Sequence, residues 1–90
     1  MSNPEVERSI EAILMVVDEP VTELTLATVL GVTVDEVVAA LGNLTGSYDG
    51  RGFSLKAING GWRFYSSPDC AAVVEKFVLD GQQNLSLIHI

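Results

Sequence analysis

Few side chains in this sequence have the chemistry of a catalytic or metal-binding site. The chain of 90 residues holds one histidine, His89, and one cysteine, Cys70. A catalytic nucleophile needs a base beside it, and His89 lies in a short apolar tail that does not hold it against Cys70 or a serine. One cysteine and one histidine also cannot supply the three or four ligands of a typical zinc site. We therefore expect no enzyme, no metal and no cofactor.

The acidic pairs are the other candidates for chemistry. Asp18-Glu19 and Asp35-Glu36 are adjacent in sequence, and neighbouring residues on a helix do not face one another as an acid/base pair would. Asp35-Glu36 instead suits the positive end of a helix. Gly50-Arg51-Gly52 lacks the rest of any phosphate-binding motif and is expected to be a turn, and Cys70 is expected to be a small filler near the start of a helix.

The charge and the apolar pattern restrict the class of protein. Five basic against twelve acidic residues give a net charge of -7, which disfavours a polyanionic partner. The longest apolar run, Ala12 to Val17, is far shorter than the roughly 20 residues that cross a bilayer. The N-terminus lacks the basic flank and apolar stretch of a secretion signal, and one cysteine cannot form an internal disulfide. We expect a cytoplasmic protein without a membrane segment.

The first half of the chain has the periodicity of helices. A first helix follows Asn3-Pro4, a cap and a proline at the first helical position, and ends at Asp18-Glu19-Pro20. Thr22 caps a short second helix, and Gly31 ends it.

A third helix has the sharpest start. Thr33 and Glu36 have the spacing of a capping box, and the helix runs to Gly46. The second and third helices, with the tight turn between them, form a helix-turn-helix pattern. In the three helices the side chains expected to face inward are Val6, Ile10, Ile13, Leu14 and Val17, then Leu26, Val29 and Leu30, then Val37, Val38, Leu41 and Leu44.

The period then changes to the alternation of a strand pair. Asn59-Gly60 is a strong hairpin signal, and placing these two residues in the loop predicts the register. The predicted pairs on the apolar face are Ala57 with Trp62, Leu55 with Phe64 and Phe53 with Ser66, and those on the polar face are Lys56 with Arg63 and Ser54 with Tyr65.

Ser67-Pro68 opens a final helix, with an apolar stripe of Val73, Val74, Phe77 and Val78 and a stop at Gly81. The predicted fold is α+β and mostly helical: a winged helix-turn-helix of three helices, a two-stranded wing and a C-terminal helix. We assign residues 1–84 to this domain. Residues 85–90 are expected to be a tail, either the start of a missing second domain or foreign residues.

A winged helix often binds DNA through the second helix of its motif. Here that helix has no Lys, Arg or Gln and carries Asp35 and Glu36 at the end that would meet the groove. The wing gives a locally positive strand face, so it could make weak nucleic-acid or partner contacts through Arg51, Lys56, Arg63 and Tyr65. The alternative is that these solvated charges protect an exposed hairpin from edge pairing.

The first helix favours a protein partner. With its inward residues assigned to the core, its other side still holds three apolar residues: Ala12, Met15 and Val16. A helix that is apolar nearly all round is buried by its own domain and by something else. These three residues are therefore the candidate dimer or partner interface, unless the C-terminal helix or the wing covers them within the monomer.

Three stretches together resemble the first winged-helix domain of segregation and condensation protein B, in its actinobacterial form. They are Ile10 to Met15 with Glu19-Pro20-Val21, Asn59 to Tyr65 followed by Ser67-Pro68, and Phe77 to Gln83. The resemblance covers roughly Val6 to Ser86.

The resemblance implies a non-catalytic, protein-binding and dimerisation module of the bacterial condensin complex. It implies a homodimer, the kleisin subunit (segregation and condensation protein A) as partner, and through it the structural-maintenance-of-chromosomes ATPase. Chromosome condensation and partition, at the nucleoid in the cytoplasm, would be its role. The alternative is a fragment of a winged-helix transcription factor that binds DNA through its basic wing.

Overall fold

The three N-terminal helices begin at the predicted caps. In the computed structural model, which describes the backbone of residues 3–89 and the side chains of residues 3–80, the helices are α1 (Pro4–Val16), α2 (Glu23–Leu30) and α3 (Val34–Ser47). The side chains of Asn3, Thr22 and Thr33 each accept a hydrogen bond from a backbone N–H of the first turn. Gly31 ends α2 in the left-handed conformation, with φ of 69°.

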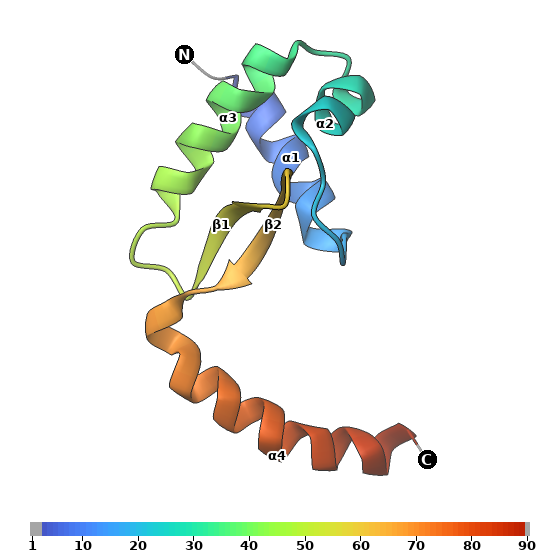
Figure 1. Cartoon of the computed structure of the whole chain (residues 1–90), viewed down its shortest axis with the longest axis vertical. Coiled ribbons are helices and arrows are strands. Elements are labelled where there is room, and N and C mark those ends of the chain that lie inside the picture. The colour runs from blue at the N-terminus through green and yellow to red at the C-terminus, as the bar shows by residue number, and fades with distance from the viewer. Residues whose placement is uncertain (1–2, 90) are drawn as a thin grey trace.

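A hairpin and a fourth helix complete the chain. Strands β1 (Phe53–Ile58) and β2 (Gly61–Ser66) are followed by a 3₁₀ turn, η1 (Pro68–Cys70), and by α4 (Ala71–His89). This order confirms the predicted winged-helix fold, with the hairpin in the position of the wing (Figure 1).

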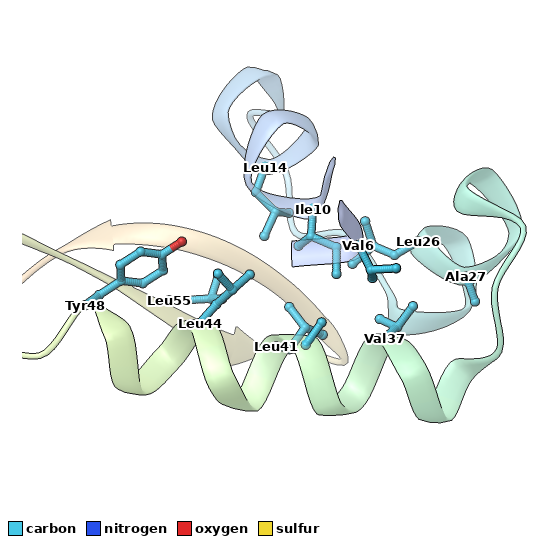
Figure 2. Close-up of a cluster of buried hydrophobic side chains, with 11 residues drawn as sticks. Val6, Ile10, Leu14, Leu26, Ala27, Val37, Leu41, Leu44, Tyr48 and Leu55 are labelled. Carbon is cyan, nitrogen blue, oxygen red and sulfur yellow. The ribbon is translucent and has the colours of Figure 1, made fainter. Parts of the chain in front are cut away.

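The core is one cluster of side chains from α1, α2, α3 and β1, completed by Tyr48 just after α3. Figure 2 shows the side chains of α1 and α2 directed onto the inner face of α3. The members of the cluster are Val6, Ile10, Leu14, Leu26, Ala27, Val37, Ala40, Leu41, Leu44, Tyr48 and Leu55. Burial of these side chains drives the helices together, since each large one stabilises the fold by roughly 1.5–3 kcal/mol.

Two residues predicted to face the core are exposed. Val29 of α2 is 66% exposed and Val38 of α3 is 45% exposed. With 3.6 residues per turn, each lies about 110° from the mean direction of the buried side chains on its own helix. The apolar residues of both helices cover a wider arc than the core does. The predictions for Val29 and Val38 were therefore wrong.

The hairpin has the predicted register. Ala57 pairs with Trp62, Leu55 with Phe64, Phe53 with Ser66, Lys56 with Arg63 and Ser54 with Tyr65. The loop residues Asn59 and Gly60 have φ of 54° and 79°, the left-handed values that a two-residue turn of this kind requires.

A contact that the sequence did not predict joins the α1–α2 connection to the wing. Val21 forms an antiparallel bridge with Trp62, with N···O distances of 2.9 and 2.7 Å. Gly61 makes this approach possible, because a Cβ at that position would lie 2.6 Å from Cβ of Pro20. The segment therefore covers the edge of β2 at this point.

The C-terminal helix differs most from the prediction. It does not stop at Gly81, since α4 extends to His89. One glycine inside a helix costs about 1 kcal/mol relative to alanine, and the glutamines that follow it favour helix. The helix leads away from the rest of the domain (Figure 1). The predicted tail, residues 85–90, has side chains outside the described residues.

Candidate protein-interaction site

The second side of α1 is open to solvent. Ala12 is exposed, and Met15 and Val16 are 73% and 81% exposed, whereas Ile10 and Leu14 on the opposite side are buried. The alternative in which the C-terminal helix covers this side is wrong, because Met15 and Val16 are exposed and α4 lies apart from α1 (Figure 1). The wing reaches α1 without covering Met15. The three candidate interface residues therefore form an accessible apolar surface.

An apolar groove adjoins this surface where α1 meets the wing. It has a volume of about 330 Å³ and is lined by Leu14, Met15, Val17, Phe53, Arg63 and Phe64. We call it the α1–wing groove. Met15 belongs to both features, so the groove and the exposed side of α1 are continuous. Arg63 is the one charged residue among those that line it.

Three aromatic rings pack together at the wing side of the groove. The ring centroids of Tyr48 and Phe53 are 4.7 Å apart, those of Phe53 and Phe64 are 5.5 Å apart, and those of Tyr48 and Phe64 are 5.6 Å apart. Tilted and edge-to-face pairs of this kind add to the stability that area burial alone gives. The helical period of α1 cannot predict this groove, because its other wall comes from Phe53, Arg63 and Phe64, which lie far later in the chain.

Polar contacts fix α1 against α3. The Tyr48 hydroxyl donates a hydrogen bond to Glu11 Oε2, and Asn43 Nδ2 donates one to Glu7 Oε2 at 2.8 Å. Burial raises the pKa of the Tyr48 phenol, and the hydrogen bond and negative charge of Glu11 raise it further. Tyr48 therefore stays protonated well into the alkaline range, as a donor that helps to position α1.

The basic residues of the wing do not gather into one site. Lys56 and Arg63 are cross-strand partners, and the Arg63 guanidinium lies 5.6 Å from the centroid of the Tyr65 ring. Arg51 instead borders a second hollow, of about 480 Å³, which Asp49 and Asp69 also line. Two carboxylates beside Arg51 oppose binding of a phosphate there.

The face that a helix-turn-helix motif would turn toward DNA is acidic in this chain. Asp35 and Glu36 occupy the first turn of α3, and both are exposed. Arg51 and Lys56 are exposed, whereas Arg63 and Tyr65 are half-buried. The two carboxylates at the N-terminus of α3 would repel a phosphate backbone. The arrangement therefore favours a protein partner over DNA.

Other kinds of site can be checked in the described part of the chain. Within it, no group of three or more His, Cys, Asp and Glu side chains is placed to hold a metal ion. Among those same residues no single helix is long and apolar enough to cross a membrane; α2 and α3 together reach the length, with a bend of 111° between them.

One family model matches most of the chain. The family model of segregation and condensation complex subunit ScpB matches residues 8–89. This chain belongs to the ScpB family. No curated protein matches it at a significant level.

Two solved structures of longer chains share the fold. Mycobacterium tuberculosis ScpB has a TM-score of 0.81 and 38% identity over 87% of this chain and 50% of its own. A conserved hypothetical protein from Chlorobium tepidum has a TM-score of 0.73 and 31% identity, over 93% of this chain and 56% of its own. The present chain thus spans about half the length of these relatives.

A third structure concerns an N-terminal domain. It is a dimer of an ScpB N-terminal domain in complex with an ScpA peptide, with a TM-score of 0.76 and 25% identity. The match covers 82% of this chain and 95% of that domain. The present fold is therefore that of the ScpB N-terminal domain.

Proposed function

We propose that this domain is a non-catalytic protein-binding and dimerisation module of the bacterial condensin complex, acting in chromosome condensation and segregation. Its partners would be a second copy of itself and the kleisin ScpA, and through ScpA the structural-maintenance-of-chromosomes ATPase. The site of action would be the nucleoid in the cytoplasm. Membership in the ScpB family supports the role, and the dimer with an ScpA peptide formed by a related domain supports the partners.

The exposed side of α1 supports a specific dimer interface. Met15 and Val16 are more than 70% exposed beside an apolar groove, and large apolar side chains grouped in this way mark interaction surfaces. A stable interface buries on the order of 1,200–2,000 Å² in total. A domain of this size reaches that area by using most of one face, and Ala12, Met15 and Val16 lie on the face with the groove.

Substitution of Met15 by glutamate tests the interface. The side chain is exposed in the monomer, so Met15→Glu should leave folding intact. In the dimer the carboxylate would lose water within a mostly apolar contact, which costs several kcal/mol and weakens association more than a hundredfold. Sedimentation should therefore show a folded monomer, with an unchanged circular dichroism spectrum.

Leu24→Glu provides the matched control. Leu24 is on α2 and is 67% exposed, so the same change of charge is made away from the groove. This variant should remain dimeric. A Met15→Glu protein that is folded and still dimeric would show that the interface lies elsewhere, and a parent chain that is monomeric at high concentration would refute the dimer itself.

A further inference from the structure

The described side chains of the C-terminal helix, in residues 71–80, are mostly exposed and are not packed against the rest of the domain. Val73, Phe77 and Leu79 are 65%, 71% and 60% exposed. The radius of gyration is 15.6 Å, against about 12 Å expected for a compact chain of this length. The difference arises because α4, a helix of 19 residues and so about 28 Å long, projects from the base of the hairpin, where β2 ends (Figure 1). The three apolar side chains named above therefore have no surface of their own domain that buries them.

The segment that leads into α4 is anchored to the base of the wing. Ser67 is buried, its N–H donates to the carbonyl of Gly52 at 2.9 Å, and its hydroxyl donates to the carbonyl of Arg51 at 2.6 Å. The Ser67 carbonyl accepts from Cys70 N–H at 2.9 Å, which closes η1. These three hydrogen bonds anchor the start of η1 to the base of the wing, so α4 begins at a defined point on the domain surface.

The groove and the helix are complementary in polarity and charge. The groove is apolar except for Arg63, and no carboxylate in residues 3–80 forms an ion pair with that guanidinium. On α4, Val73 and Phe77 are four residues apart and Asp80 follows three residues later, so the three lie along one face. This face offers two apolar anchors and, one turn further on, a carboxylate.

We infer that α4 seats in the α1–wing groove of a second copy of this chain, and that the second copy's α4 does the same in return. Phe77 enters the groove beside Met15, and Asp80 pairs with Arg63 across the interface. The exchange rests on the homodimer proposed above, and Met15 belongs both to that dimer interface and to the groove. A two-fold axis makes every contact twice and closes the assembly, which leaves no unfilled groove for further copies.

Cysteine pairs distinguish this arrangement from other dimers. Cys70→Ser removes the native thiol, and in that background one chain carries Met15→Cys and the other carries Phe77→Cys. A disulfide needs Cβ atoms about 3.5–4.5 Å apart, so a mixture of the two chains should form a 15–77 cross-link under mild oxidation. Leu24→Cys mixed with Phe77→Cys is the control, and its cross-linking should be at least tenfold slower.

The outcomes separate the exchange from the dimer. If the chains sediment as a dimer but Met15→Cys and Phe77→Cys cross-link no faster than Leu24→Cys and Phe77→Cys, the exchange is overturned. The dimer itself would then stand. Chains that are monomeric would overturn both. A single chain carrying Met15→Cys and Phe77→Cys that closes an internal disulfide in a monomer would show that α4 covers its own groove instead.

Charge reversal gives an independent readout. Arg63→Asp places two carboxylates together at each groove and should weaken dimerisation about tenfold, since partly exposed pairs contribute modestly. Adding Asp80→Arg to the same chain restores opposite charges and should recover most of that loss. If the double variant dimerises no better than Arg63→Asp alone, residues 63 and 80 are not partners.

Discussion

Gly61 is where the α1–α2 connection approaches the wing, and a single methyl group tests how closely. In Gly61→Ala the new Cβ would lie 2.6 Å from Cβ and 2.9 Å from the carbonyl carbon of Pro20, and 3.1 Å from Val21 N. Atoms of a proline ring and of the backbone cannot rotate away, so the connection itself must move. The bridge between Val21 and Trp62, with its two hydrogen bonds, would then be strained or lost.

The expected cost follows from these distances. Overpacking of a filled site costs typically about 1–3 kcal/mol. For a domain of this length each kcal/mol corresponds to roughly 4–8 °C in melting temperature. Gly61→Ala should therefore melt roughly 5–20 °C below the parent, measured by circular dichroism at 222 nm with a denaturant titration to obtain the free energy of unfolding.

Gly42→Ala is the matched control, because it adds the same methyl group and should raise the melting temperature instead of lowering it. Gly42 is an exposed residue inside α3, and nothing lies within 4 Å of a Cβ there. Alanine in a helix interior is favoured over glycine by about 0.5–1 kcal/mol, so this variant should melt higher than the parent. If Gly61→Ala also melted at or above the parent temperature, the close contact between the connection and the wing would be refuted.

Two further predictions concern DNA and pH. The domain should not bind labelled duplex DNA tighter than about 1 μM in roughly 150 mM salt, because its net charge is -7 and α3 presents Asp35 and Glu36; sequence-specific binding below that concentration would contradict the protein-binding role. The pKa of Tyr48 is raised above its ordinary value of 10.0, so the folded protein keeps the phenol proton where the unfolded chain loses it. This contribution is complete below pH 10 and is lost as the pH rises above it, by at most about 1.4 kcal/mol per pH unit. Between pH 9 and pH 11, Tyr48→Phe should lose less stability than the parent, and equal losses would show that Tyr48 does not titrate differently in the two states.

Local signals in the sequence determined the elements. Asn3, Thr22 and Thr33 cap the helices as predicted, because a hydroxyl or amide side chain two or three residues before an N–H can reach it without help from the rest of the fold. Asn59-Gly60 determined the hairpin register for the same reason, since two residues that accept positive φ define which strand positions face each other. The charge distribution and the scarcity of His and Cys were also sequence properties.

The sequence also located the apolar residues of the candidate surface without deciding what covers them. The spacing of Ala12, Met15 and Val16 placed them opposite the buried side of α1, and the structure exposes all three. The same reasoning placed Val29 and Val38 in the core, where they are not. Helical periodicity gives the angle between side chains on one helix, but it contains no information on how wide a face the neighbouring elements cover.

Tertiary structure alone decided the features that join distant segments. The Val21–Trp62 bridge, the α1–wing groove and the anchoring of Ser67 on Arg51 each bring together residues about 15 to 50 positions apart. Such contacts depend on the summed geometry of every turn between them, which no local pattern specifies. Gly81 is a case where a local signal was misleading. Its residue type suggested the end of a helix, but a glycine ends a helix only where the backbone turns away. Here the backbone continues as helix to His89.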